Sequence, residues 1–459
     1  MFRIRSTITP SFLEAVLITF MIIALMAVCI VQFDAVPHMP IVLAILLLIT
    51  YGLFKRVPFK KLEEGLVEGS KAGLGAIFIF FFIGILISSW MMGGTIPTLI
   101  YLGFQFITPH FFFAIVFIVT CIVGLSIGSS LTTVATVGVA FIGMASAMDT
   151  SLAITAGAIV SGAFFGDKMS PLSDTTNLAS AIVQVDLFEH IRNMGWTTIP
   201  AFFISLVGYA ILSPNKEIQE LDQINAFQEG LLQTGMVHWY TLLPIVLLLI
   251  LSIKKVPAII ALALTSIAAI CVSYFFQYTP FGEVLNILFN GYVSSTGIEA
   301  VDLLLTRGGM NSMLFTIGLV ILALSMGGLL FTLGIVQSLL SKVESLLKSV
   351  GSVITAAAFT GIGVNTLIGE QYLSILLTGE SFQAQFKKVG LANKNLARVM
   401  EDAGTVVNPL VPWSVCGIFI TNVLAVSTID YLPFAFFCLL SPILTILFGL
   451  TGKTLTYLK

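Results

Sequence analysis

Long apolar runs separated by short polar stretches make up most of the chain. A membrane-spanning helix needs about 20 apolar residues, and most of the runs are close to that length. The pattern predicts helices over residues 12–32, 38–54, 74–92, 98–124, 130–148, 151–185, 196–213, 237–253, 257–278, 312–333, 350–380, 410–427 and 431–451. We therefore expect an all-α polytopic membrane protein with about 10–14 membrane segments, some of them re-entrant hairpins.

One polar stretch interrupts this pattern inside a predicted membrane segment. Residues 162–177 contain two aspartates, a lysine, an asparagine, four hydroxyl side chains, a proline and two glycines. An Asp or Lys at the centre of an inserted helix costs roughly 2.5–3.5 kcal/mol. Non-helical backbone at membrane depth is tolerated only inside the protein or beside a water-filled cavity. The stretch therefore predicts a broken helix that builds a polar site.

Short sequence landmarks recur in the two halves of the chain. Met92-Gly93-Gly94 matches Met326-Gly327-Gly328, and Ser170-Pro171-Leu172 matches Asn408-Pro409-Leu410. The separation along the chain is nearly the same for both matches, which favours an internal duplication. We therefore expect a first membrane repeat over 1–213, an external polar linker over 214–236 and a second membrane repeat over 237–459.

The distribution of Lys and Arg indicates that the second repeat is inverted. Residues 72–166 contain neither, whereas the matching part of the second half holds Lys342, Lys348, Lys387, Lys388, Lys394 and Arg398. Cytoplasmic loops collect Lys and Arg. With an odd number of crossings in each half, both termini and all the basic clusters are predicted in the cytoplasm, and the linker outside.

The composition agrees with a membrane protein and limits the other classes. The chain is 57% hydrophobic and only 10% charged, against about 25% charged residues in a soluble domain. The five cysteines are scattered through apolar runs, and no Cys/His cluster has metal-ligand spacing. We expect the lipid bilayer as the main partner, no nucleic acid and no resident cofactor.

Inverted repeats with broken helices near mid-membrane are typical of secondary transporters. The broken stretch supplies hard oxygen ligands suited to Na⁺, namely Asp167, Ser173, Asp174, Thr175, Thr176 and Asn177. Burial and a second nearby carboxylate also favour binding of a proton. Two structural alternatives stay open: a buried Asp167–Lys168 ion pair that fixes the bend, and Asp174 as the N-cap of the following helix.

Two further stretches are candidates for the other parts of the site. The first holds Ser129, Ser130, Thr132 and Thr133. It fits either a re-entrant tip or close helix packing through Gly124 and Gly128. The second is the partner of the first in the other half, and its candidates are Asn365, Thr366 and Glu370, with an interfacial position as the alternative for Glu370.

Residues 401–414 mirror the broken stretch in the second half. Asp402 and Asn408 are the candidates there, and a cytoplasmic cap is the alternative for Glu401. The two isolated histidines His110 and His190 are expected at the membrane interface. The candidate Na⁺ ligands over the whole chain are Asp174, Thr176, Asn177, Asn365 and Asp402.

Residues 166–177, Gly-Asp-Lys-Met-Ser-Pro-Leu-Ser-Asp-Thr-Thr-Asn, resemble the NhaC family of Na⁺/H⁺ antiporters. Residues 128–133, Gly-Ser-Ser-Leu-Thr-Thr, and the length and repeat layout also fit, so the resemblance covers nearly the whole chain. The family includes bacterial proteins similar to malate–proton/sodium–lactate antiporters. The resemblance implies hairpin tips at 128–133 and 363–371, unwound helices at 166–177 and 401–414, a bacterial cell membrane and a homodimer.

The function ranked first is exchange of Na⁺ for H⁺ by alternating access, and malate–proton/sodium–lactate exchange is the alternative. An organic acid would need a buried cation, for which Lys168 is the candidate. A nucleotide-driven pump is disfavoured because Leu447 stands where a P-loop needs glycine. An intramembrane aspartyl protease is disfavoured because Phe164 breaks the required Gly-x-Gly-Asp element. A channel would pass ions without proton coupling.

Overall fold

The computed structural model describes residues 6–33, 35–71, 73–106, 111–214, 228–298, 301–302, 305–343 and 349–458. These residues form helices joined by short turns, and their only β-type pairings are two isolated bridges. Among them are six helices long and apolar enough to cross a membrane, three bent helix pairs that would add three spans, and four shorter apolar helices. These segments together fall within the predicted range, and the all-α polytopic architecture is confirmed.

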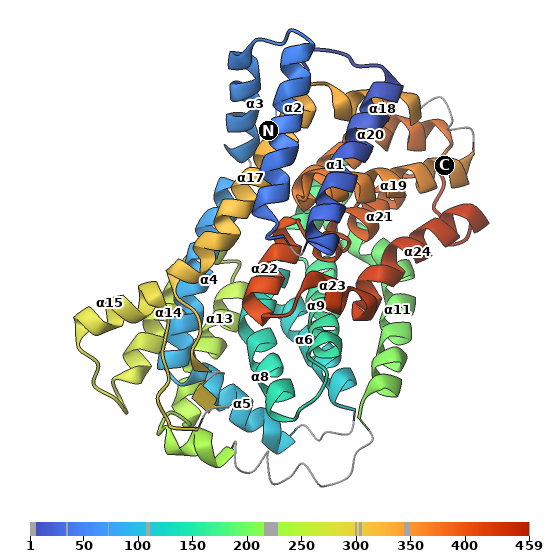
Figure 1. The fold of residues 1–459 in the computed structure, drawn as a ribbon. Helices are drawn as coiled ribbons and strands as arrows, with labels where there is room; N and C mark the ends of the chain where they lie inside the picture. The colour runs from blue at the N-terminus through green and yellow to red at the C-terminus, as the bar shows by residue number, and fades with distance from the viewer. Residues whose placement is uncertain are drawn as a thin grey trace.

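The first half of the chain contributes α1 (Phe12–Ala27), α2 (His38–Phe54), α3 (Phe59–Lys71), α4 (Leu74–Met92), α5 (Thr95–Phe106), α6 (Phe112–Ile127), α7 (Ser130–Thr133), α8 (Val139–Ala147), α9 (Leu152–Met169), α10 (Asp174–Ile182) and α11 (Leu187–Leu212). The second half contributes α13 (Leu243–Ile253), α14 (Ala258–Ser273), α15 (Phe281–Asn290), α17 (Leu314–Thr332), α18 (Ile335–Val343), α19 (Val350–Ile368), α20 (Gln371–Lys388), α21 (Asn393–Met400), α22 (Val415–Leu424), α23 (Thr428–Tyr431) and α24 (Phe436–Thr451). Figure 1 shows their arrangement.

Helices in both halves of the chain bend and turn at glycines with positive φ. The bend between α4 and α5 falls at Gly94 and the bend between α17 and α18 at Gly334, both with positive φ. The turns that end α6 and α19 fall at Gly128 and Gly369, again with positive φ. The two Met-Gly-Gly landmarks differ in local position, because Met92-Gly93-Gly94 ends α4 at its bend whereas Met326-Gly327-Gly328 lies inside α17.

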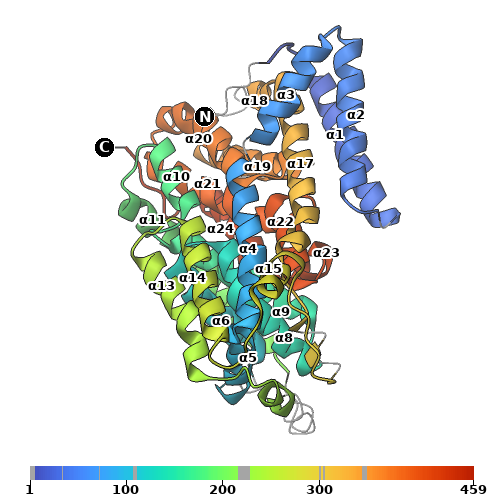
Figure 2. The same ribbon diagram turned by 90° about the vertical axis from the view of Figure 1, so that its left-hand side faces the viewer.

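Gly328 of the second Met-Gly-Gly stretch is needed for helix packing and not for a bend. A Cβ at Gly328 would lie 2.1 Å from the carbonyl oxygen of Gly65 and 2.8 Å from the Cα of Gly69, both on α3. Helix α3 thus lies directly against α17, and in the same way α14 packs along α4 (Figure 2). The first helices of each half therefore cover the long helix of the other half.

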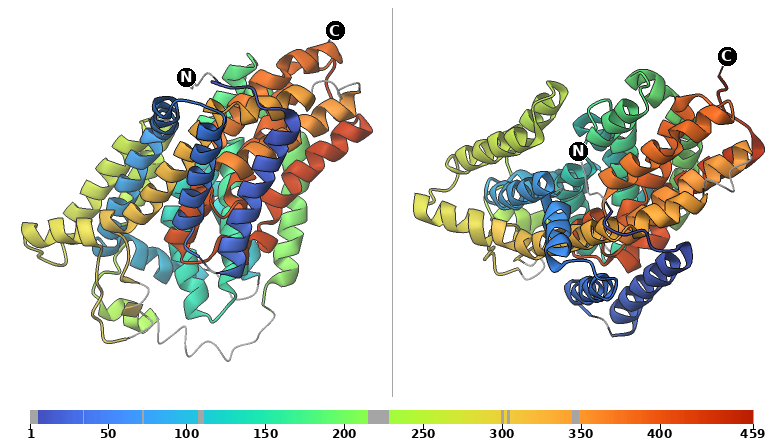
Figure 3. Two further views of the ribbon diagram at one scale, coloured as in Figure 1. Left: turned by 45° about the horizontal axis from the view of Figure 1, so that its top comes forward. Right: turned by 90° about the horizontal axis from the view of Figure 1, so that it is seen from above.

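The turn at Gly128 joins α6 and α7 into a first hairpin, and the turn at Gly369 joins α19 and α20 into a second. The two hairpins begin at opposite ends of the molecule. The first begins beside the end of α11, where the amide of Phe113 donates to Ser213 Oγ at 3.1 Å. The second begins beside the C-terminal segment, since Gly351 packs against Leu450. Figure 3 shows the N- and C-terminal segments at one common end, which the second hairpin therefore shares. The first hairpin enters from the other end.

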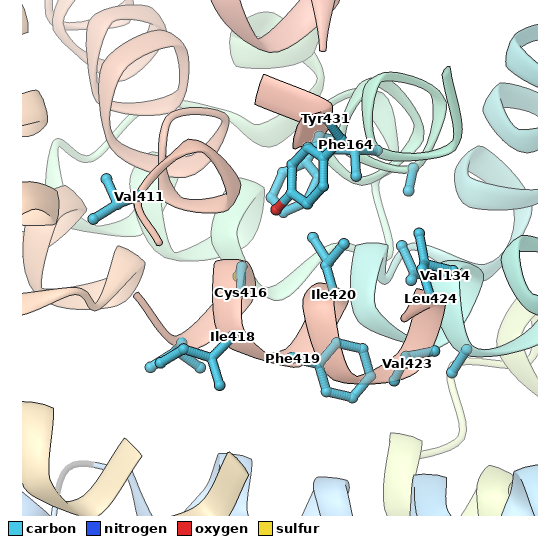
Figure 4. Close-up of a cluster of buried hydrophobic side chains, with 14 of the residues drawn as sticks. Val134, Phe164, Val411, Cys416, Ile418, Phe419, Ile420, Val423, Leu424 and Tyr431 are labelled. Carbon is cyan, nitrogen blue, oxygen red and sulfur yellow. The ribbon is translucent and has the colours of Figure 1, made fainter. Parts of the chain in front are cut away.

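Apolar side chains from both halves meet beside the broken helices. Phe164 of α9 and Val134 lie against Tyr431 of α23 and the α22 side chains Ile420 and Leu424 (Figure 4). All are buried. This apolar cluster fixes α22 against α9, so that the two broken segments approach each other in the centre.

Helices α6 and α9 touch through their backbones at Gly124 and Gly166. A Cβ at Gly166 would lie 2.4 Å from the carbonyl carbon of Gly124 and 2.4 Å from the amide nitrogen of Leu125. The close-packing interpretation of Gly124 therefore holds, whereas Gly128 forms the hairpin turn. This contact sets the height of the hairpin tip relative to α9.

Gly166→Ala tests that contact. Because the new methyl group meets backbone atoms that cannot move independently, we expect the free energy of unfolding to fall by about 1–3 kcal/mol. Thermal unfolding of the detergent-solubilised protein measures the change. Gly195→Ala on α11 is the matched control, since its Cβ would meet only Ile199 Cδ1 at an ordinary 3.6 Å. Equal unfolding temperatures for both variants would contradict the close approach of α6 and α9.

Candidate functional site

The tip of the first hairpin lies against Asp167. After the turn at Gly128, Ser129 is extended and caps α7 through Thr132. The amide and hydroxyl of Ser130 then donate to Asp167 Oδ2 at 3.2 and 2.6 Å, and the hydroxyl of Ser173 donates to Oδ1 at 2.5 Å. The Asp167 carboxylate thus accepts three hydrogen bonds while only 5% of the residue is exposed.

The break after α9 is held by the side chains that the motif places there. Ser173, and not Asp174, is the N-cap of α10, so the capping alternative for Asp174 is wrong. The hydroxyl of Thr176 donates to the Lys168 carbonyl at 3.1 Å, and the amide of Asn177 donates to the Ser173 carbonyl at 2.7 Å. Thr176 and Asn177 therefore satisfy backbone groups that the break leaves free.

A cavity of about 310 Å³ reaches this carboxylate. Its polar lining includes Ser129, Ser130, Thr132, Asp167, Asp174, Thr175, Asn177 and Gln371. Its lining also includes Lys255, Val256 and Pro257, in the turn between α13 and α14. The hydroxyl of Thr175 is 3.0 Å from that of Ser173, which connects the lining to Asp167. Polar side chains of four different helical segments therefore line the cavity.

Lys168 forms its ion pair with Asp402 and not with Asp167. Both side chains are completely buried, and Thr197 of α11 donates to the same oxygen, Asp402 Oδ1, at 3.2 Å. Successive residues of a helix point about 100° apart, so Lys168 faces the second broken segment while Asp167 faces the hairpin tip. The alternative of a buried Asp167–Lys168 ion pair is therefore wrong.

The equivalent place in the second half is occupied by a neutral amide. Asn408 precedes its helix-capping Ser414 by six residues, as Asp167 precedes Ser173. Its amide donates to Asn365 Oδ1 at 2.8 Å, and Asn365 in turn donates to the Gly404 carbonyl at 2.6 Å. Asn365 and Asn408 thus hold the second hairpin to the second broken segment without a charge.

Other predicted residues have local structural roles. Glu370 is 7% exposed and caps α20 by accepting from the Leu373 amide at 2.7 Å, so the interfacial alternative is wrong. The hydroxyls of Thr133 and Thr366 bond within their own helices, to Ser129 and Ile362 carbonyls at 2.8 and 2.9 Å. None of these three lines the cavity.

Two predictions of exposed positions are also wrong. Glu401 and His190 are both completely buried, because the turn after α21 lies inside the bundle and His190 is on the inward face of α11. His110 lies outside the described residues. Sequence reasoning missed Thr197 and Tyr372 as neighbours of the site, although Tyr372 follows the second hairpin tip directly.

A second cavity of about 330 Å³ lies between the end of α22 and the segments 290–293 and 306–308. Arg307 lines it and donates to the Val423 carbonyl at 3.4 Å. The loop before Arg307 is ordered by Asp302, whose carboxylate accepts from the amides of Thr296 and Gly297 at 2.7 and 3.0 Å. The hydrogen bond from the Thr296 amide is the main cause that lowers the pKa of Asp302 to about 2.

Comparison with known proteins identifies the family. The model of the Na⁺/H⁺ antiporter family matches residues 162–453. The chain belongs to this family. It is 43% identical to the Na⁺/H⁺ antiporter NhaC of Alkalihalophilus pseudofirmus, over 91% of this chain and 90% of that one. It is 39% identical to NhaC of Bacillus subtilis, over 93% and 94% of the two chains. The resemblance to the NhaC family is thus confirmed.

A relative with another printed substrate is the malate-2H⁺/Na⁺-lactate antiporter of Bacillus subtilis, 32% identical over 98% of this chain and 97% of that one. The solved structure of Neisseria gonorrhoeae MtrF covers 96% of both chains at 14% identity, but its TM-score of 0.42 supports no conclusion. The antiporter family and the apolar helices together make this chain a multi-pass membrane transporter and not an enzyme.

The Lys168–Asp402 pair gives a double-mutant test. Lys168→Met leaves Asp402 buried and unpaired, so we expect a loss of about 3–5 kcal/mol in unfolding free energy. Lys168→Met combined with Asp402→Asn removes the uncompensated charge and should recover most of that loss. Denaturant unfolding in detergent measures both variants. A double variant no more stable than the single one would show that the two charges do not compensate each other.

Proposed function

We propose that the protein exchanges Na⁺ for H⁺ across the bacterial cell membrane by alternating access, with Asp167 as the residue that binds either ion. The observation that carries the proposal is the position of its carboxylate, in the lining of a cavity and hydrogen-bonded to the hydroxyls of Ser130 and Ser173. A proton and a Na⁺ ion compete for one carboxylate, and such competition alone couples their movements in opposite directions.

The chemistry of the surrounding groups supports a transported cation. The hydroxyls of Ser130, Ser173 and Thr175 can turn from donating to the carboxylate to presenting lone pairs to Na⁺. The charge of Lys168 is balanced by Asp402, so Asp167 keeps its own negative charge for the cation. No group of three His, Cys, Asp or Glu side chains in the described ranges could hold a resident metal ion.

The other candidate residues would assist ion binding in this proposal without binding the ion as Asp167 does. Asp174 and Gln371 line the cavity and would attract and guide the cation. Asn365 and Asn408 would hold the second half of the site in shape. Asp402 would act through Lys168 and not as a Na⁺ ligand, and Thr176 and Asn177 would support the break.

The proposed orientation follows the charge distribution. Both termini are cytoplasmic, the linker is outside, and the basic turn at Lys254 and Lys255 is inside. Lys255 lines the cavity and is exposed, so the described conformation would open the cavity to the cytoplasm at this turn. The inverted repeats over 1–213 and 237–459 supply the opposite conformation by exchanging their arrangements. A homodimer is proposed from the family resemblance alone.

Exchange of organic acids ranks second because of one specific contact. Lys168, its candidate cation, donates to Asp402 and does not line the cavity. A carboxylate substrate would meet Asp167 and Asp174 there, and Lys255 is the only basic residue among the described lining residues. The relative named for malate and lactate keeps this function as the alternative.

Asp167→Asn tests the proposed ion-binding residue. In proteoliposomes, we expect Na⁺-dependent proton flux to fall to background, because an amide binds neither a proton nor Na⁺ as a carboxylate does. Asp174→Asn should raise the KM for Na⁺ several-fold and leave kcat near the wild type. Asp149→Asn, in a turn between α8 and α9, is the matched control and should behave as the wild type. Wild-type exchange by Asp167→Asn would refute the assignment.

The same vesicles separate the two candidate substrates. We expect a pH gradient alone to drive Na⁺ movement, with no effect of added malate or lactate. Na⁺ movement that requires a lactate or malate gradient, and that a pH gradient alone does not produce, would favour the organic-acid exchanger instead.

A further inference from the structure

The second cavity described above, here called the Arg307 cavity, shares no lining residue with the cavity of the proposed ion site. The non-helical segment that carries Arg307 lies deep in the protein. The amide of Gly309 donates to the carbonyl of Gly84 at 2.9 Å, and Gly84 lies in the middle of α4. A Cβ at Gly308 would lie 2.5 Å from the amide nitrogen of Ser88 on the same helix. This segment therefore reaches the middle of a helix that belongs to a candidate membrane span.

Irregular backbone at such a depth is tolerated where it is buried in the protein or lines a water-filled cavity. One wall of the Arg307 cavity consists of two short segments that pair as an antiparallel bridge between Tyr292 and Arg307. The other wall is the end of α22. The amide of Asn422 joins that end to the start of α17, because it donates to the Ser312 carbonyl at 2.9 Å and to the Thr316 hydroxyl at 3.0 Å. Both walls are thus fixed by hydrogen bonds.

The positive charge of Arg307 has no counter-ion among the described residues. A guanidinium carries five N–H donors, and the half-buried side chain of Arg307 uses one of them, in the 3.4 Å contact with the Val423 carbonyl. No aspartate or glutamate is among the described lining residues. The carboxylate of Asp302, five residues before, is occupied by hydroxyls and amides of its own loop. A cavity lined by one sign of charge attracts the opposite charge.

Two hydroxyl groups of the lining are also able to donate to a ligand. The hydroxyl of Tyr292 has only the sulfur of Met236 as acceptor, at 3.9 Å, and a thioether is a weak acceptor. The hydroxyl of Thr306 accepts from the Ser294 amide at 3.1 Å and donates to no acceptor among the described residues. Both residues line the cavity beside Arg307. The polar part of the lining therefore suits an anion that accepts several hydrogen bonds.

The rest of the lining is apolar and suits the body of an organic molecule. The aliphatic and thioether side chains are those of Ile87, Val139, Val293, Met313 and Val423. Binding sites for small molecules combine such a lining with a few polar groups and begin at about 300 Å³, and this cavity measures about 330 Å³. One guanidinium balances one negative charge, and its planar fork matches the two oxygens of a carboxylate.

We propose that the Arg307 cavity binds a short-chain monocarboxylate. The ligand's carboxylate pairs with the Arg307 guanidinium, and its apolar body lies against the aliphatic lining. The bound molecule bridges the end of α22 and the paired segments, so it stabilises the described conformation. The site is separate from Asp167 and does not depend on the proposed Na⁺/H⁺ exchange. It also differs from the exchange of organic acids considered above, whose candidate cation is Lys168.

Equilibrium dialysis of radiolabelled isobutyrate against the purified protein in detergent tests the site. We expect saturable binding to the wild type and no competition by the neutral isostere isobutyramide. Arg307→Gln removes the charged fork, so its Kd should rise by about tenfold or more. Isobutyrate should also raise the unfolding temperature of the wild type, because it binds the folded state, and should leave that of Arg307→Gln unchanged at the same concentration.

A second variant keeps Arg307 and its contact with Val423. Asn290 is exposed and lines the cavity. Asn290→Asp places a carboxylate there, which repels the ligand and pairs with the guanidinium in its place. We expect a rise of the Kd for isobutyrate similar to that in Arg307→Gln. This variant tests the site even if Arg307→Gln does not fold.

Two matched controls change the same residue types outside the cavity. Arg192→Gln removes an exposed arginine of α11, and Asn286→Asp adds a carboxylate one turn before Asn290, on the same helix α15. Neither residue lines the Arg307 cavity. Both variants should bind isobutyrate with the Kd of the wild type.

The possible results separate this proposal from the proposed exchange. Absence of saturable isobutyrate binding to the wild type would overturn the site. An unchanged Kd in folded Arg307→Gln or Asn290→Asp would overturn it too, because the ligand would then bind elsewhere. Competition by isobutyramide or chloride as strong as that by unlabelled isobutyrate would overturn the ligand class. Absence of Na⁺-dependent proton flux in vesicles would refute the proposed exchange alone, since this binding is measured without a gradient.

Discussion

A polar group inside a membrane protein must find its partner within the protein, because lipid offers none. The centre of this molecule is organised by that constraint. The break after α9 exposes backbone groups, and the hydroxyl and amide side chains of Ser173, Thr176 and Asn177 satisfy them. The same break brings the Asp167 carboxylate to the hairpin tip, where Ser130 meets it with an amide and a hydroxyl. The residues that hold the break and the residues of the proposed ion site are thus one set.

The two halves satisfy the constraint differently, and the difference has a functional meaning. The first half places a carboxylate, Asp167, between hairpin and broken helix, whereas the second places the amide of Asn408 there. An amide pair such as Asn365–Asn408 keeps the same hydrogen bonds at every pH, since neither partner titrates. The contact of Asp167 in the first half can therefore change when the carboxylate binds a proton or a cation. The Asn365–Asn408 contact in the second half stays the same.

The sequence predicted the helical architecture, the polar break and the family, because apolar runs and the polar motif at 166–177 are local features. The predictions were wrong where a residue's partner or burial depends on a segment far away in the sequence. Lys168 has an aspartate beside it in sequence, but its partner Asp402 lies in the other half of the chain, and only the packing of α9 against the second break reveals this. Glu401 follows a basic stretch and so looked like a surface cap, whereas α19 and α20 bury it. Cap preference does not distinguish Ser173 from Asp174, and the two Met-Gly-Gly stretches look alike although Gly328 in the second serves packing and not a bend.

The backbone contact between Gly124 and Gly166 has a consequence for how the molecule works. Helices that touch without side chains between them leave no room for one to tilt or slide on the other. The hairpin tip and the broken helix therefore pack as one unit. In the proposed exchange, the carboxylate and its hydroxyl partners would move together past the helices α13 and α14 that border the cavity, so ion selectivity would be the same on both sides of the membrane.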